Sequence, residues 1–358
     1  MEGKRKEVKD RISVLDSKAE LFVLHDDEVA ELHELSVNLH SLARVHNSIS
    51  CWQKSRMNWL NEGDANSNIF GGVMSHWRRH NAINMVSVGG VNVEGVNNVR
   101  TTVFEHFSNH FKVNGEARPD VAGLHFRKLS FGEAGNLTKP FSVEEVRQTI
   151  WDCDGCKSPG PDGINFDFIK IFWDILKDDF MRFLVEFHRN DKLTKDINST
   201  FIALIPKVNS PQRLSDFRPI SLVGCLYKVL AKVLAIRLRA VIGLVVSDSQ
   251  SAFVKGNQIL DGIVIANVVV DEVRRRGREL LMFKVYFEKV YDSVDLNYLH
   301  AVMAHINFPT FWRKWISECV GTTTTFVLVN GSPTKEFLIE WGLRQGDPLS
   351  SFLFLLAT

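Results

Sequence analysis

Apolar residues recur at helical spacing near the start of the chain. Between residue 4 and about residue 60, two apolar stripes flank an acidic break at 25–28, and stripe members are three or four positions apart. The stripes are Val8, Ile12, Leu15, Ala19 and Phe22, then Val29, Leu32, Leu35, Leu39 and Leu42. This spacing predicts two amphipathic helices. They can form a hairpin, pair with another chain or pack as an ordinary arm.

Short strand patterns and helical patterns follow one another in the next part of the chain. Met85 to Val93, with two glycines between apolar runs, predicts a small hairpin, and Val103 to Phe111 predicts a helix. From Gly115 to Leu137 the pattern is polar and aperiodic, so this segment is the best candidate for a linker. The spacing of Ser142 and Glu145 then predicts a capping box at the start of another helix.

The second half of the chain mixes strands and helices, which indicates an α/β (α+β) fold. Phe201 to Lys207 and Asp216 to Val223 have strand patterns, and Phe308 to Ile316 has a helical one. Thr323 to Ile339 predicts a hairpin around an Asn-Gly turn. The final apolar run, 351–358, predicts a helix whose apolar face lacks partners.

One helix of this half carries a row of cations. Tyr227 to Leu238 is amphipathic, and we expect Lys228, Lys232, Arg237 and Arg239 to face outward. Either a nucleic-acid backbone runs along such a face, or the face contacts only water.

The segment from Glu279 to Val294 combines a strand pattern with a polar exit. Residues 280–287 are mostly apolar and β-favouring, and Lys289 to Ser293 form a polar turn. Glu288, Lys289 and Asp292 lie either at the edge of a site or in a solvated connection.

The composition of the chain argues against several classes of protein and site. The chain has 358 residues, 45% apolar and 24% charged, with a formal net charge of +1, so any nucleic-acid surface must be local. Five scattered cysteines, including a lone CxxC at Cys153 and Cys156, do not predict a disulfide framework or a zinc site. Because no signal peptide and no membrane-length apolar run is present, we expect a soluble intracellular protein, in the nucleus or cytoplasm.

Two stretches interleave indoles with cations. Trp52 and Trp59 alternate with Lys54 and Arg56, and Trp77 precedes Arg78, Arg79 and His80. This mixture suits stacking on bases while neutralising phosphates. A helix surface with snorkelling cations has the same spacing.

Several motifs occur together in one order from about Trp52 to the end of the chain: QKSRMNWLNEGDAN, KSPGPDG, ALIPK, DFRPISLV, QSAFVKG, FEKVYDSV, LVNGSPT and GLRQGDPLS. In these motifs the chain resembles the reverse transcriptases of non-LTR (LINE-type) plant retrotransposons. The resemblance implies an incomplete right-hand polymerase, with fingers and a partial palm over 138–358, a helical N-terminal arm and small hairpin over 1–114, and a linker over 115–137. Neither the family's endonuclease nor its thumb is recognisable.

The resemblance also implies roles for particular residues. Lys207 and Arg218 would hold the phosphates of the incoming deoxynucleoside triphosphate. Tyr291 matches the aromatic steric gate against a ribose 2′-hydroxyl, and Gln345 and Gly346 match the loop under the templating base. On a purely structural interpretation, Lys207 protects a strand edge, Arg218 is structural, and Arg344 pairs with Asp347.

Catalysis in the family depends on Mg²⁺ held by three Asp residues. Tyr286 stands at the first of these positions, and the chain ends at Thr358, before the Asp-Asp box that supplies the other two. Asn257, Trp341 and Ser351 also depart from the family pattern. We therefore expect an inactive, truncated and degenerate reverse transcriptase, without intact catalytic or metal-binding residues, whose partners would be an RNA template and a DNA primer.

Two other interpretations stay open. The chain can be a non-catalytic RNA-binding remnant that uses Lys54, Arg56, Arg78 and Arg79. It can also be an active polymerase whose Asp box comes from another polypeptide or from readthrough.

Overall fold

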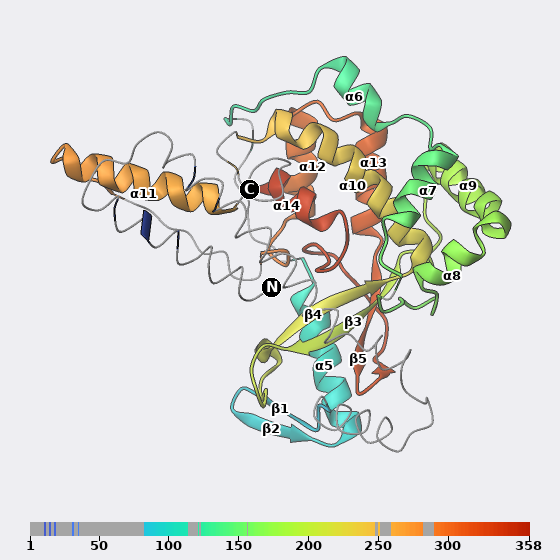
Figure 1. Ribbon diagram of the computed structural model, residues 1–358. Coiled ribbons are helices and arrows are strands. Elements are labelled where there is room, and N and C mark those ends of the chain that lie inside the picture. Colours follow the sequence, from blue (N-terminus) through green and yellow to red (C-terminus); the bar gives the residue numbers. More distant parts are fainter. Residues whose placement is uncertain are drawn as a thin grey trace. The chain divides into compact units, whose positions relative to one another are not determined.

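The computed structural model describes residues 82–113, 121, 123–155, 157–247, 250, 259–281 and 290–358, and residues 11, 14, 15, 18, 31 and 35 nearer the N-terminus (Figure 1). The chain divides into two compact units, Met1–His80 and Asn81–Thr358. In the first unit, the described residues are helical, and Arg11 Nε lies 2.8 Å from Glu31 Oε1.

The second unit contains a five-stranded sheet in the order β4-β3-β5-β6, with β7 also paired to β5. Its strands are β3 (Ser199–Pro206), β4 (Phe217–Val223), β5 (Thr324–Val329), β6 (Ser332–Pro333) and β7 (Phe337–Leu338). Strand β3 is antiparallel to β4 and parallel to β5. The predicted hairpin after β5 is confirmed, because Asn330 and Gly331 turn the chain with positive φ angles of 52° and 81°, although its return strand is split into β6 and β7.

One face of this sheet is covered by α5 (Val96–His110), which follows the predicted hairpin of β1 (Met85–Val88) and β2 (Val91–Glu94). Val103 and Phe107 of α5 share a hydrophobic core with Ile202 of β3 and Val327 of β5. Figure 1 shows α5 along this side of the sheet. The elements just before residue 114 therefore belong to the same core as the sheet.

A second core surrounds the long central helix α10. Its helices are α6 (Phe131–Leu137), α7 (Val143–Trp151), α8 (Phe166–Ile171), α9 (Trp173–Asn190), α10 (Cys225–Val245), α12 (Leu296–His305), α13 (Thr310–Gly321) and α14 (Ser350–Ala357). Trp312 and Trp315 of α13 are fully buried, as the apolar pattern of that segment predicts. A further helix, α11 (Ile259–Arg275), precedes the segment 282–289, which lies outside the described residues.

Several sequence expectations are corrected. The segment 115–137 contains α6, because Ser130 and Glu133 form a reciprocal capping box and Leu137 is buried. Ser142 caps α7 as predicted, but the box is not reciprocal, since Glu145 binds Arg237 instead.

Two predictions about exposure are wrong. Arg237, expected to face outward, is buried and also donates to the Leu137, Lys139 and Pro140 carbonyls. The apolar side chains of α14, expected to lack partners, are buried in the core around α10.

Candidate nucleotide and template site

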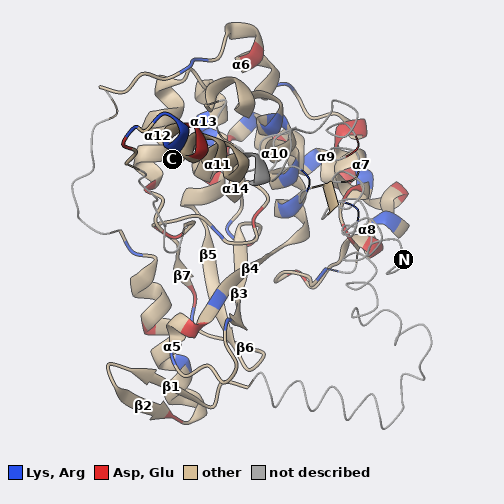
Figure 2. Cartoon of the chain, turned by 60° about the vertical axis from the view of Figure 1, so that its left-hand side comes forward, with Lys and Arg blue, Asp and Glu red and all other residues tan. Residues whose placement is uncertain are grey.

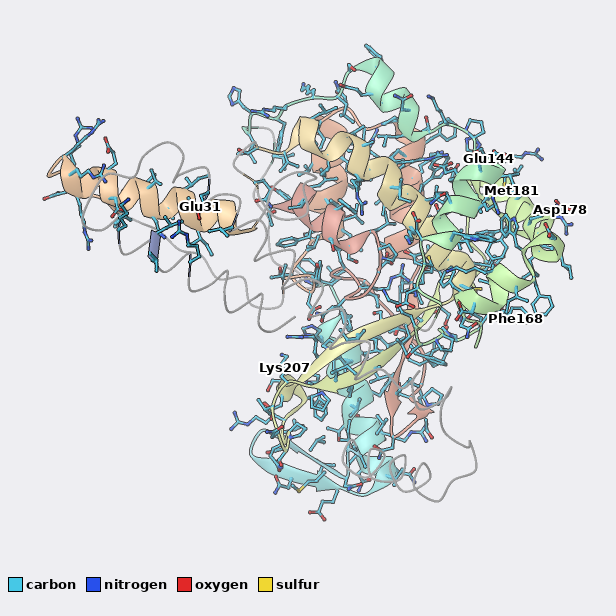
Figure 3. All side chains as sticks on the ribbon, in the orientation of Figure 1. Glu31, Glu144, Phe168, Asp178, Met181 and Lys207 are labelled. Atoms are coloured by element: carbon cyan, nitrogen blue, oxygen red, sulfur yellow. The ribbon has the colours of Figure 1, made fainter. Side chains whose placement is uncertain are left out.

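The face of the sheet opposite α5 carries the two predicted phosphate ligands. The side chains of Ile202 and Phe217 face α5, so strand alternation turns Ile205, Arg218 and Ile220 to the open face. Ile205 pairs directly with Arg218. Lys207 lies two positions beyond Ile205 and continues the same face, at the far end of the hairpin (Figure 3).

Both cations are accessible on this open face. Lys207 and Arg218 are exposed, and Lys207 Nζ donates to the Ser215 carbonyl oxygen at 3.0 Å. Within the described part of the chain, the Arg218 side chain has no hydrogen-bond partner. Two exposed cations on one face, beside the exposed Ile205, are able to meet an anion from solvent.

The Gln345–Gly346 segment lies against the middle of β4. The Ser221 amide donates to the Gln345 carbonyl oxygen at 2.7 Å, so the loop is bonded to the free edge of the strand. Gly346 has a φ of 108°, and a Cβ there would lie 2.9 Å from the Ser221 carbonyl oxygen and 3.5 Å from Ile220 Cγ2. Only glycine allows this backbone conformation and this approach.

The same loop is bonded to the segment that contains Tyr291. The Leu343 amide donates to the Tyr291 carbonyl oxygen at 2.7 Å, and the Gly342 amide donates to Val294 at 3.0 Å. The Tyr291 hydroxyl lies 3.3 Å from the Ser351 hydroxyl of α14. The structure therefore places the Tyr291 backbone beside the loop that contains Gln345 and Gly346, and that loop lies against β4. Arg218 lies three residues before Ser221 on the same strand.

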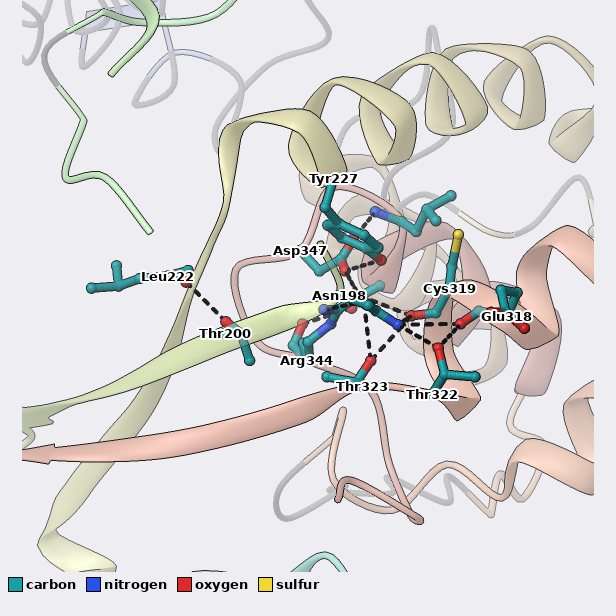
Figure 4. Close-up of polar contacts among 12 residues, drawn as sticks. Asn198, Thr200, Leu222, Tyr227, Glu318, Cys319, Thr322, Thr323, Arg344 and Asp347 are labelled. Atoms are coloured by element: carbon teal, nitrogen blue, oxygen red, sulfur yellow. Dashed lines mark hydrogen bonds and ion pairs between the residues drawn. The ribbon is translucent and has the colours of Figure 1, made fainter. Parts of the chain in front are cut away.

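A buried polar network anchors this loop (Figure 4). Arg344 Nη2 lies 2.7 Å from Asp347 Oδ2, and both side chains are at most 3% exposed. The Tyr227 hydroxyl of α10 donates to the same carboxylate oxygen at 2.7 Å, and the Arg344 guanidinium stacks 4.1 Å above the Tyr227 ring. Arg344 also donates to Asn198 Oδ1 at 3.0 Å. The predicted pairing of Arg344 with Asp347 is confirmed.

Burial within this network raises the pKa of two side chains. Burial raises the pKa of the Tyr227 phenol well above its ordinary value, and the Arg344 charge partly opposes that shift. Burial also raises the pKa of the Cys319 thiol, and the Asp347 carboxylate adds to the effect. Tyr227 is therefore a neutral hydrogen-bond donor to Asp347.

The KSPGPDG loop is fixed to the junction between β4 and α10. A Cβ at Gly160 would lie 2.4 Å from the Val223 carbonyl carbon, so glycine is required by close backbone approach. Asp162 Oδ2 accepts a hydrogen bond from the Cys225 amide, the first residue of α10. This carboxylate satisfies an amide that the helix itself leaves without a partner.

Part of the predicted site lies outside the described residues. Tyr286 and the four cations Lys54, Arg56, Arg78 and Arg79 fall there. Sequence reasoning missed Asn198 and Tyr227, which complete the network around Arg344. No spacing signal joins them, because they come from β3 and α10 and meet the loop only in the folded chain.

Comparison with known proteins gives a family match and several relatives. Residues 205–358 match the model of the family described as reverse transcriptase (RNA-dependent DNA polymerase). The chain is 31% identical to the transposon TX1 uncharacterized 149 kDa protein of Xenopus laevis over 221 aligned residues, which are 62% of this chain. It is 29% identical over 156 residues, 42% of this chain, to the retrovirus-related Pol polyprotein from type-1 retrotransposable element R2 of Popillia japonica.

A third relative is the retrovirus-related Pol polyprotein from type-2 retrotransposable element R2DM of Drosophila melanogaster, 26% identical over 199 residues, 56% of this chain. The chain spans 17%, 21% and 18% of the lengths of these three relatives. The match defines residues 205–358 as a reverse transcriptase domain. Because these relatives come from retrotransposons, the domain is of the non-LTR retrotransposon type.

Reverse transcriptases normally use a divalent metal. Among the residues that the structure describes, no three or more His, Cys, Asp or Glu side chains are grouped so as to hold one. Asp292, which follows Tyr291, has its Oδ2 3.0 Å from His110 Nε2. No helix in this described part of the chain has the length and apolar character needed to cross a bilayer.

Proposed function

We propose that this chain is the nucleotide- and template-binding part of a retrotransposon reverse transcriptase and that it does not polymerise DNA itself. In this proposal, Lys207 and Arg218 bind triphosphate oxygens, Gln345 and Gly346 lie under the templating base, and Tyr291 lies against the sugar of the nucleotide. The observation that carries the proposal is the bonding of the Gln345–Gly346 loop to β4, the strand that presents Arg218 on its open face.

The proposed inactivity rests on the chemistry of Tyr286. By the resemblance, this residue occupies a position where the family has a metal-binding Asp. A phenol with a pKa of about 10 is neutral at pH 7 and is a poor Mg²⁺ ligand. Losing about 4 kcal/mol of metal stabilisation would slow the reaction roughly a thousandfold.

Ligand binding tests the first part of the proposal. Binding of a fluorescent deoxynucleoside triphosphate to the full chain with an RNA template and DNA primer should weaken at least about tenfold in Lys207→Gln/Arg218→Gln, because charge-assisted contacts to phosphate are lost. The matched control is Lys177→Gln/Arg182→Gln, which removes two exposed cations of α9. Equal affinities of the two double variants would refute these roles.

A primer-extension assay with Mg²⁺ tests the second part. The unchanged chain should incorporate no labelled nucleotide, and incorporation would refute the proposed inactivity. The non-catalytic RNA-binding alternative predicts a different pattern. RNA binding would survive in Lys207→Gln/Arg218→Gln. It would disappear in the variant with alanine at Lys54, Arg56, Arg78 and Arg79.

A further inference from the structure

Four lysines gather around the start of α10. They come from three elements and are called the lysine cluster below: Lys157, Lys170, Lys228 and Lys232. Lys170 Nζ of α8 donates to the Cys153 carbonyl oxygen at 2.6 Å, and Lys232 Nζ lies 3.4 Å from Cys153 Sγ. Figure 2 shows basic positions along α10 in blue.

The positions of Lys228 and Lys232 are unfavourable for the isolated helix. Cations stabilise a helix at its C-terminal end, where the macrodipole is negative. In α10, Lys228 follows closely on the N-terminal residue Cys225, the first turn has no acidic residue and the last turn has no basic one. Lys228 and Lys232 are also four positions apart on one face, where like charges repel.

Burial and neighbouring charges both act on Lys228. Partial burial lowers the pKa of the Lys228 ammonium, with further lowering by Lys157 and Lys232, while Cys153 and Asp154 oppose the shift. Lys228 Nζ lies 5.2 Å from the centre of the Phe166 ring. Asp162 accepts a hydrogen bond from the Cys225 amide, and the Asp167 carboxylate lies beside Gly155.

The lysine cluster lies close along the chain to the point where the Gln345–Gly346 loop bonds to β4. Ser221, which bonds to Gln345, is four residues before Cys225, so the two Cα atoms are at most about 14 Å apart. Arg218 lies on the other side of Ser221 along β4. The Gln345–Gly346 loop thus lies between the proposed triphosphate ligands and the lysine cluster.

We propose that the lysine cluster binds backbone phosphates of single-stranded template RNA as the strand approaches the Gln345–Gly346 loop. This inference rests on the proposed function, since it extends the same site by a strand-binding surface. Lysine ammonium groups are flexible point charges, and phosphate contacts of this kind position a strand without reading its sequence. The lysine cluster should therefore bind RNA of any sequence with the same affinity.

Fluorescence anisotropy of the full chain with two labelled hybrids tests this inference. Both hybrids have the same RNA–DNA duplex, but only one has a long single-stranded RNA 5′ overhang. In Lys228→Gln/Lys232→Gln, affinity for the overhang hybrid should fall about tenfold, and the slope of log affinity against log salt should decrease by about 1.4, or 0.7 per lost contact. Affinity for the blunt hybrid should not change.

Three further variants complete the design. Lys228→Arg/Lys232→Arg should retain overhang binding, and Lys177→Gln/Arg182→Gln on α9 should match the unchanged chain. Lys157→Gln, an exposed loop substitution, should weaken overhang binding without endangering the α10 core. Triphosphate affinity should be the same in all of them, which separates a strand phosphate from a nucleotide phosphate.

The outcomes separate this inference from the proposed function. If the unchanged chain binds the overhang hybrid no more tightly than the blunt one, or the Gln variants weaken both equally, the lysine cluster is not a template surface. If the unchanged chain binds neither hybrid, the proposed function fails as well.

Discussion

At the scale of single residues, the buried pair of Arg344 and Asp347 is the feature that holds the Gln345–Gly346 loop. Replacing Arg344 by Met should reduce the free energy of unfolding by about 3–5 kcal/mol, because Asp347 keeps its buried charge without its cation. Urea denaturation measures the change. Lys195→Met is the control, since Lys195 Nζ forms an exposed pair with Glu336 at 2.9 Å and should contribute less than about 1 kcal/mol. Similar losses in both variants would contradict the anchoring role of the network.

Sequence alone identified some of these residues and not others. Arg344 and Asp347 are three positions apart, so their pairing is visible in the local pattern. The partners Tyr227 and Asn198 are remote in sequence, and only the packing of α10 and β3 against the loop brings them there. Arg237 shows the opposite error: its cation suggested an outward face, but Glu145 and three carbonyl oxygens satisfy it inside the core.

At the scale of elements, two glycine-to-alanine substitutions should have opposite signs. Gly160→Ala should destabilise the chain by about 1–3 kcal/mol, because its Cβ would overlap the backbone between β4 and α10. Gly135→Ala should stabilise it by roughly 0.5–1 kcal/mol, because Gly135 lies inside α6 with open space around the Cβ position. Thermal denaturation followed by circular dichroism distinguishes these results, and a stabilising Gly160→Ala would show that the KSPGPDG loop is not held against β4.

Element boundaries follow from the sequence where the local chemistry is strong. The Asn330–Gly331 turn and the Ser142 cap were predictable, because each is specified by residues only a few positions apart. The short helix α6 was missed, since its seven residues include two glycines and its stability comes from the Ser130–Glu133 box and burial of Leu137. The burial of α14 was also missed, because its partners on α10 and α12 are distant in the chain.

At the scale of the whole molecule, two cores support one proposed site. The core beneath the sheet fixes the open face of β3 and β4, and the core around α10 fixes the loop that contains Gln345 and Gly346. The overall charge of +1 conceals this local arrangement, in which exposed cations lie on the open sheet face and half-buried lysines lie at the start of α10. Nucleic-acid binding should accordingly depend on these local surfaces and weaken steeply with salt.

Photocrosslinking of the full chain tests the proposed site as a unit. An RNA template with 4-thiouridine at the templating position, annealed to a DNA primer, is irradiated with the protein, and mass spectrometry identifies the crosslinked peptide. We expect the crosslink on the peptide that contains Gln345 and Gly346. Crosslinks found exclusively in other segments would contradict the assignment of this loop to the template.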